Sequence, residues 1–529
     1  MPKKIFLVLI ALMMMFSAAE AASEKILFIP HDNRPVSRQQ PAEVIEQLGY
    51  EVLMPAPELI TQPLELWHWL DENAPSASAA VLSSDALLYG GLFDSRKHEI
   101  PIAELSARVE NFKTLRTSHP DLKLYAFGSL MRTPSFGTEG DIEEPAYYGK
   151  HGGDIFSLTA LLDKQETDTL TAEEIQQLDE LKNKIPAEVL NDWFARREKN
   201  LSATKQLIDF AAAGVVNCFI IGRDDNAPLC QTHRENRQLT AYIKSLDVSE
   251  RTVQSHAGID EYAMLLLARA VNDLRDICPS VYVEFNRGVG AKTVPDFSDE
   301  ELGISIRDEI SLAGGVKINN PARADFVLFV NTDMNGKTYE THNSFPPQSL
   351  TSREKRHLRR SAKYFSSKVA EAVEKNFPVG IADVSFANGA DNALMAQLQK
   401  KNLLYKLQAY SGWNTATNSS GFVIGTGVLT KHMSRASREK LLTRRYLDDW
   451  AYQANVRTQI AAELAKYPDG LAIYIHFGEH AADIESRENL LMHEFAAKNL
   501  PTLDLLKNFT VTNPLRRMFE CEIHFAAKK

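Results

Sequence analysis

Apolar and polar positions alternate along this chain in a repeated order. Short apolar runs rich in β-branched and aromatic residues are each followed by a polar cluster and then by a stretch with helical spacing. This order predicts βα units built around a parallel sheet. The predicted strands are Ile26–Ile29, Ala80–Leu82, Leu122–Phe127, Cys218–Ile221, Thr252–Gln254, Phe326–Val330, Val379–Val384 and Lys406–Tyr410.

The number of these strands favours a TIM-like (β/α)8 barrel with helical insertions and a mainly helical C-terminal region. Two further runs are strand-like but are assigned to segments outside the barrel. Glu51–Met54 is assigned to a segment that leaves the barrel early in the chain, and Val281–Phe285 to an inserted segment. The predicted barrel covers 22–430, with a polar helical insertion at 140–205, and a helical extension at 431–529 closes on it. The alternative is an open doubly wound parallel sheet in two domains.

The N-terminus has the features of a secretion signal. Two lysines precede the apolar run Ile5–Phe16, and the small residues that end at Ala21 fit a cleavage site. The apolar run is shorter than the roughly 20 residues that a bilayer span needs. We therefore expect residues 1–21 to be removed, and the mature protein to be periplasmic or extracellular and without a membrane span.

The charge balance argues against a nucleic-acid partner. The chain has 59 basic and 69 acidic residues and a formal net charge of −10 at pH 7. An acidic surface disfavours phosphate backbones, so we expect a small-molecule or glycan substrate. One basic run, Arg353 to Lys375, is predicted to be the solvated outer face of a helix. We expect no cofactor.

The four cysteines do not have the paired spacing of a zinc site. They are predicted to be buried thiols or to form a single disulfide, and none is assigned a catalytic role.

Polar side chains follow the end of every predicted strand. In α/β folds ligands bind at the carboxyl ends of the strands, so these side chains should converge on one site. A capping role is the alternative, because Asp and Asn often cap the helix that follows. The side chains predicted to bind substrate are Asp32, Arg34, Asp85, Arg132, His256, Asp260, Glu261, Asn331, Asp383, Asn388, Asp391, Trp413 and Asn414.

The pair Asp224-Asp225 comes directly after an apolar strand. Adjacent carboxylates repel each other, so one of them can keep its proton near neutral pH. Such a group can act as a general acid while its neighbour stays charged. The alternative is a helix cap followed by a first-turn acid. We predict that both aspartates are catalytic.

Two other patterns could carry chemistry. Trp413 lies in a polar loop, where its ring could stack on a sugar ring. The alternative interpretation is that Trp413 is a core residue beside turn-forming residues. His476 to His480 matches H-x-x-E-H, with Glu485, Glu488 or Glu494 as a further zinc ligand. That motif needs a helix, which Gly478 weakens, so we predict a strand end and a loop there.

Several short motifs occur in order along the chain: Pro30–Pro35, Arg223–Asp225, Gly258–Glu261, Asn388–Asp391, Gly412–Thr415 and Arg517–Glu520. They resemble those of a bacterial family catalogued as domain of unknown function 4127, and the resemblance covers nearly the whole mature chain. Because that family has no assigned activity, the resemblance implies no chemistry.

The Asp-Asp pair after the fourth predicted barrel strand is also similar to the hexosaminidases of glycoside hydrolase family 84. This local resemblance implies that Asp224 orients a substrate acetamido group and that Asp225 is the general acid. It also implies that Asn414 contacts the sugar.

The leading hypothesis is an exported glycosidase-like hydrolase that acts on cell-wall or environmental glycans. A metal-dependent hydrolase is one alternative, with Asp32, Asp224, Asp225 and Asp260 as hard oxygen ligands. A non-catalytic glycan- or solute-binding protein is the other.

Overall fold

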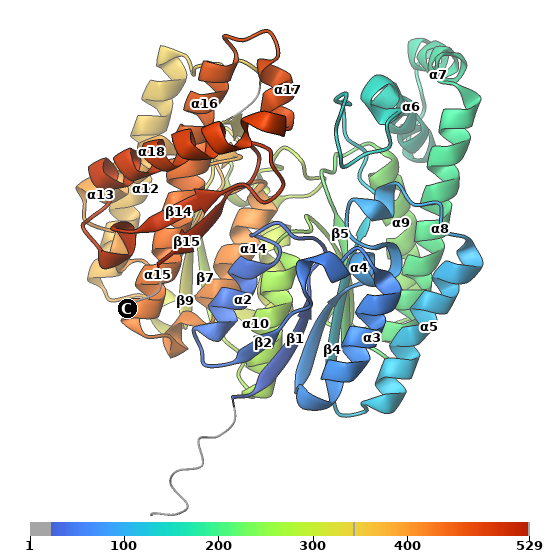
Figure 1. Ribbon diagram of the computed structural model, residues 1–529, viewed down its shortest axis with the longest axis horizontal. Coiled ribbons are helices and arrows are strands. Elements are labelled where there is room, and N and C mark those ends of the chain that lie inside the picture. The colour runs from blue at the N-terminus through green and yellow to red at the C-terminus, as the bar shows by residue number, and fades with distance from the viewer. Residues whose placement is uncertain (1–22, 342–343, 527–529) are drawn as a thin grey trace, which may run out of the picture.

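The computed structural model describes residues 23–341 and 344–526. Its two main sheets are open and consist of parallel strands (Figure 1). The first sheet has the order β2-β1-β3-β4-β5-β6 and the second the order β13-β11-β9-β7-β8. Their strands are β1 Lys25–Ile29, β2 Glu51–Leu53, β3 Ala79–Ser83, β4 Lys123–Leu130, β5 Cys218–Arg223, β6 Val253–Ala257, β7 Ser280–Phe285, β8 Val316–Lys317, β9 Phe326–Asn331, β11 Val379–Asp383 and β13 Ala409–Ser411.

The prediction of a single closed barrel was wrong, and the open doubly wound alternative fits. In each sheet the first strand lies inside, with the second strand on one side and the third on the other, which is the doubly wound order. The barrel prediction failed because Val281–Phe285, assigned to an insertion, belongs to β7 and begins a second sheet. Strand β2, which was predicted to lie outside the barrel, forms an edge of the first sheet.

The helices cover both faces of each sheet. They are α2 Gln39–Glu46, α3 Pro63–Asn73, α4 Ser84–Tyr89, α5 Ile102–Ser118, α6 Tyr148–Thr167, α7 Ala172–Lys184, α8 Ala187–Ala212, α9 Gln231–Ser245, α10 Tyr262–Leu274, α11 Leu302–Leu312, α12 Ser352–Glu374, α13 Asn392–Lys400, α14 Ala416–Gly427, α15 Arg435–Arg445, α16 Arg457–Leu464, α17 Gly470–Ile475 and α18 Ala481–Asn499. A π-helix, Tyr446–Val456, joins α15 to α16.

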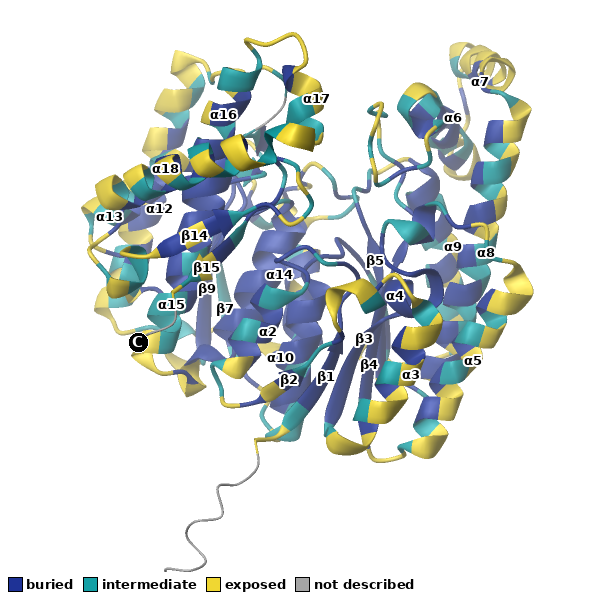
Figure 2. Cartoon of the chain, in the orientation of Figure 1, coloured by how far each residue is buried: buried dark blue, intermediate teal, exposed yellow. Residues whose placement is uncertain are grey.

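Two buried helices join the sheets. Helix α10 packs on the first sheet, α14 packs on the second, and the two helices pack on each other. Figure 2 shows that both are buried along most of their length. A Cβ atom on Gly421 would lie 2.6 Å from Cβ of Glu261, so the close approach of the helices depends on a glycine there. One hydrophobic core therefore extends across both sheets.

The remaining elements form two outer regions (Figure 1). Helices α6, α7 and the first part of α8 stand beyond the first sheet, and α8 continues along it. Helices α15 to α18 and the antiparallel pair β14 (Phe509–Thr512) and β15 (Glu522–Phe525) cover the second sheet. A short parallel pair, β10 (Tyr339–Glu340) and β12 (Phe386–Ala387), lies apart from both sheets.

Within the described ranges, no helix is both long and apolar enough to span a bilayer. The predicted signal peptide lies outside those ranges. All four cysteines are free thiols, three of them buried and Cys278 exposed, so the structure contains no disulfide between them.

Candidate functional site

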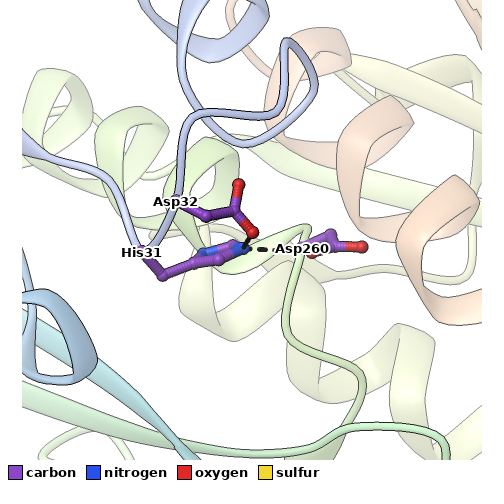
Figure 3. Close-up of side chains that lie close together, drawn as sticks. All are labelled: His31, Asp32 and Asp260. Atoms are coloured by element: carbon purple, nitrogen blue, oxygen red, sulfur yellow. Dashed lines mark hydrogen bonds and ion pairs between the residues drawn. The ribbon is translucent and has the colours of Figure 1, made fainter. Parts of the chain in front are cut away.

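The ends of β1 and β6 bring together a compact group of charged side chains. His31 Nε2 lies 3.1 Å from Asp260 Oδ1 and 3.3 Å from Asp32 Oδ2 (Figure 3). Arg34 donates from Nε to Asp32 Oδ2 at 2.8 Å and from a terminal nitrogen to Asp260 Oδ1 at 2.5 Å. All four side chains are buried, so each charge is balanced by a direct partner.

Two amides from the other half of the molecule complete this group. Asn414, which follows β13, donates from Nδ2 to Asp260 Oδ2 at 2.9 Å. Asn418, in the first turn of α14, donates to the same oxygen at 3.2 Å. The carboxyl ends of the two sheets therefore meet at Asp260. We call the six side chains the Asp260 cluster: His31, Asp32, Arg34, Asp260, Asn414 and Asn418.

The charges of the Asp260 cluster hold one another in their ionised forms. Burial lowers the pKa of His31, but Asp32 and Asp260 outweigh that effect and raise it to about 9. Burial opposes ionisation of Asp32 as well, and Arg34 and His31 still hold its pKa well below the usual range. The pKa of Asp260 is lowered for the same reason. His31 is therefore a cation in this cluster and is not poised to act as a general base near neutral pH.

A second group of charges lies at the end of β5. Asp224 Oδ2 accepts a hydrogen bond from Arg96 at 2.5 Å, and Asp225 Oδ2 accepts one from Arg132 at 2.7 Å. The backbone of Asp225 is left-handed, with a φ of 40°. For a residue other than glycine, a rarely populated conformation of this kind costs about 1–3 kcal/mol, and such residues concentrate at functional sites.

The loop before α6 supplies two more acids to this group. Arg132 contacts Glu144 at 2.6 Å and Glu143 at 3.1 Å, and Arg96 also reaches both glutamates. Arg517, between β14 and β15, pairs with Glu143 at 2.9 Å and brings the C-terminal segment over the group. We call these side chains the Asp225 cluster: Arg96, Arg132, Glu143, Glu144, Asp224, Asp225 and Arg517.

Phe93 links the two clusters. Its ring centroid lies 5.6 Å from the guanidinium carbon of Arg34 and 5.8 Å from those of Arg96 and Arg517. Asp85, after β3, lies close enough for the charges of His31 and Arg96 to act on it. Burial nevertheless raises the pKa of Asp85 to about 6. The two clusters are therefore parts of one polar region.

Within this region, Asp225 has the properties of a proton donor. Burial and the neighbouring charge of Asp224 raise the pKa of Asp225 to about 7, although Arg132 and Arg96 oppose the shift. The Asp225 side chain is 27% exposed, against 12% for that of Asp224. A substrate would therefore reach Asp225 more easily than Asp224.

Several residues predicted to bind substrate lie elsewhere. At the carboxyl ends of strands β9 and β11 in the second sheet, Asp383 accepts hydrogen bonds from Asn331 Nδ2 at 2.8 Å and from the backbone of Asp391 at 2.8 Å. The Tyr410 hydroxyl donates to Asp383 at 2.9 Å. These buried groups bond to one another and, within the described part of the chain, to neither cluster. Their observed role is to connect the strand ends of the second sheet.

The side chains of three more predicted residues form no hydrogen bond with either cluster. His256 is buried beside Gln254 at 2.7 Å, and burial lowers its pKa to about 4. Glu261 is buried beside α14, and burial raises its pKa well above the usual range. The Asn388 side chain donates to Glu340 at 3.2 Å.

The structure does not support an exposed sugar platform at Trp413 or a zinc motif near residue 478. Trp413 is only 4% exposed, and its ring packs against Phe519 with 5.8 Å between centroids. Helix α17 ends before His476, and Gly478 has a φ of 54°, so His476 and His480 do not share a helix face.

Sequence reasoning missed several members of the clusters. His31 and Arg517 lie within two of the short family motifs, and that position was the available signal. Arg96 lies 128 positions from Asp224, and Glu143 and Glu144 lie well inside the long loop between β4 and α6. No local pattern marks residues of that kind.

Among the described residues, one group offers three possible metal ligands whose donor atoms all lie within 4.8 Å of one another: His31, Asp32 and Asp260. The guanidinium of Arg34 already contacts both of its carboxylates. Asp224 and Asp225 pair with Arg96 and Arg132 instead, so the predicted set of four aspartate ligands is not assembled.

Comparison with known proteins gives one family. The family model described as "Protein of unknown function (DUF4127)" matches residues 26–524. The resemblance read from the short motifs is therefore confirmed. No curated protein and no solved structure matches the chain, so the similarity to glycoside hydrolase family 84 gains no support.

Proposed function

We propose a catalytic role for this chain, which belongs to the DUF4127 family: it is a hydrolase that cleaves glycosidic bonds by carboxylate acid–base catalysis. Asp225 is the general acid and Asp224 its charged partner. The observation that carries this proposal is the turn after β5, in which adjacent carboxylates pair with different arginines and Asp225 adopts a left-handed backbone. The arginines hold the two side chains apart in fixed orientations.

The proposed reaction adds water across the scissile bond. Asp225 gives its proton to the leaving-group oxygen as the bond to the sugar breaks, and Arg132, 2.7 Å away, stabilises the carboxylate that remains. Asp224 stabilises the positive charge that develops on the sugar. Water then adds to the sugar carbon and returns a proton to Asp225, which restores the starting state.

The polar region suits a substrate rich in hydroxyl groups. Carboxylates accept and guanidinium groups donate hydrogen bonds, and both kinds of group alternate across the Asp225 cluster. The N-terminal pattern of a secretion signal supports an extracellular or periplasmic glycan as the substrate.

Turnover of purified peptidoglycan, and of aryl glycosides whose leaving group needs a proton, by the wild type and by Asp225→Asn tests this function. Loss of a general acid lowers the rate by about 10²–10⁴-fold. Asp247→Asn is the matched control, because Asp247 is exposed and also left-handed, with a φ of 51°. Equal turnover by wild type and Asp225→Asn would remove Asp225 from the mechanism.

A metal-dependent hydrolase is the second candidate, and the close grouping of His31, Asp32 and Asp260 favours it. One imidazole nitrogen and two carboxylate oxygens suit a divalent cation. The candidate ranks second because Arg34 already balances both carboxylates. Activity abolished by a chelator and restored by added Mn²⁺ or Zn²⁺ would favour it over the first.

A further inference from the structure

Helix α12 has two unlike faces. A capping box formed by Thr351 and Glu354 fixes its start. Leu358, Phe365 and Val369 are buried on its inner face. The outer face is strongly basic, since the segment 353–368 contains seven lysines and arginines and one acidic residue. Six of the basic side chains lie close together and are exposed: Arg353, Lys355, Arg356, Arg359, Arg360 and Lys363.

These six side chains lack acidic partners. None of them forms an ion pair or a side-chain hydrogen bond with any residue in 23–341 or 344–526. Helical cations elsewhere pair within their own helix, as Arg108 does with Glu104 and Arg435 with Glu439. On α12 the neighbours one turn away carry the same charge, which destabilises the helix. An ordinary solvated face needs no such concentration of one charge.

The basic half of α12 lies at the functional end of the molecule. His357 contacts Asp333, just after β9, at 2.6 Å, and the helix then leads back to the start of β11. Helix α12 therefore runs antiparallel to the strands, and its first turns lie at the carboxyl ends of the second sheet. Figures 1 and 2 show α12 on the outside of the molecule.

The shape of the basic surface favours a linear partner. The exposed cations follow one helix for about 15 Å, given a rise of about 1.5 Å per residue. Arg287 adds one more cation beside them, 4.7 Å from the ring of Tyr364. The whole chain has a net charge of −10 despite this helix, so a broad anionic surface is attracted by α12 but repelled by the molecule as a whole. A linear polymer can contact the helix alone.

We propose that the outer face of α12 binds an anionic polysaccharide through its carboxylate, phosphate or sulfate groups. Guanidinium groups form paired hydrogen bonds with such anions, and four of the six exposed cations are arginines. Lys368, the seventh basic residue of the segment, pairs with Glu371 instead. This binding surface does not depend on the chemistry proposed for Asp225.

Binding of full-length protein to fluorescent dextran sulfate, with uncharged dextran of the same length as the reference probe, tests the proposal. The triple variant Arg356→Gln, Arg360→Gln, Lys363→Gln removes the central cations. A matched triple, Lys113→Gln, Lys182→Gln, Lys184→Gln, removes three exposed lysines from α5 and α7 and changes the net charge equally. We expect the first triple to bind about tenfold more weakly and the second to bind within about twofold of wild type, because salt screens charges that lie far from the bound polymer.

Equal weakening in both triples would overturn the proposal, because the net charge of the protein would then explain the binding. Binding to phosphatidylglycerol vesicles that depends on α12, together with no binding to dextran sulfate, would replace the polymer with a membrane surface. The Asp225→Asn variant should bind dextran sulfate as well as wild type does. Failure of the catalytic proposal can thus be told apart from failure of this one.

Discussion

Asn414 donates a hydrogen bond to Asp260 across 154 positions of the sequence, with 2.9 Å between Nδ2 and Oδ2. Asp260 follows the last strand of the first sheet, and Asn414 follows the edge strand β13 of the second. This hydrogen bond joins the carboxyl ends of two sheets that would otherwise present separate edges. The polar region on which the proposed function depends is therefore a product of both halves of the chain.

Removal of this hydrogen bond should destabilise the whole fold. Asn414 has a φ of 58°, so glycine is the replacement that keeps the backbone and removes only the side chain. We expect Asn414→Gly to lower the free energy of unfolding by about 1.5–3 kcal/mol, the range for hydrogen bonds to charged groups. Chemical denaturation measures the change. A decrease no larger than that of Asn402→Gly, at a left-handed asparagine elsewhere, would show that the hydrogen bond contributes little.

The packing of α10 on α14 should tolerate no added volume. A Cβ atom on Gly425 would lie 2.8 Å from Cγ of Met264, so Gly425→Ala should lower the free energy of unfolding by about 1–3 kcal/mol. Gly153, inside α6, has only one atom near its missing Cβ, at 3.6 Å. Gly153→Ala should therefore leave stability unchanged or raise it by about 0.4–1 kcal/mol. Thermal unfolding of both variants compares the two sites directly.

The pair Arg517–Glu143 should hold the C-terminal segment in place over the Asp225 cluster. A double-mutant cycle with Arg517→Gln and Glu143→Gln should give a coupling energy of about 0.5–3 kcal/mol, because both side chains are mostly buried and in contact. Hydrogen exchange in the segment 513–521 should become faster in Arg517→Gln. If the coupling is zero and the exchange unchanged, the segment does not depend on this ion pair.

The pH dependence should report the protonated form of Asp225. Its pKa of about 7 follows from burial and from Asp224 and Glu143, against the opposing charges of Arg132 and Arg96. Activity should fall as the pH rises through about 7, since the acid loses its proton. The folded protein keeps this proton at pH values where the unfolded chain has released it, so stability should also decrease between pH ~4 and ~7. Asp225→Asn should make that decrease shallower in urea unfolding, while buried acids such as Asp391 and Asp449, whose pKa values are also raised to about 7, keep their own share of it.

The sequence predicted the strands better than the sheets. The runs at Ile26–Ile29, Phe326–Val330 and Val379–Val384 became β1, β9 and β11, because buried parallel strands are continuously apolar. How strands divide between sheets depends on pairing between distant residues, which no local pattern encodes. Val281–Phe285 was therefore placed in an insertion, although it forms β7, the strand with which the second sheet begins.

The convergence of polar side chains was predicted to a similar extent. Asp32, Arg34, Asp260 and Asn414 converge as the rule for strand ends predicts. Asn331, Asp383 and Asp391 also lie at carboxyl strand ends, but those of the second sheet. The assumption of a single barrel therefore wrongly grouped them with the residues at the ends of β1 and β6. Arg96 and Arg517 were missed because their loops reach the site only through the tertiary fold.

The most direct test of the central claim compares two substrates in Asp225→Asn. Once a hydrolysed glycan has been found, its sugar is prepared as an aryl glycoside with a good leaving group, such as dinitrophenolate, and as one with a poor leaving group. A general acid matters only when the leaving group needs a proton, so we predict that kcat/KM falls about 10²–10⁴-fold for the poor leaving group and changes little for the good one. Equal decreases for both substrates would contradict the role of Asp225 as the acid.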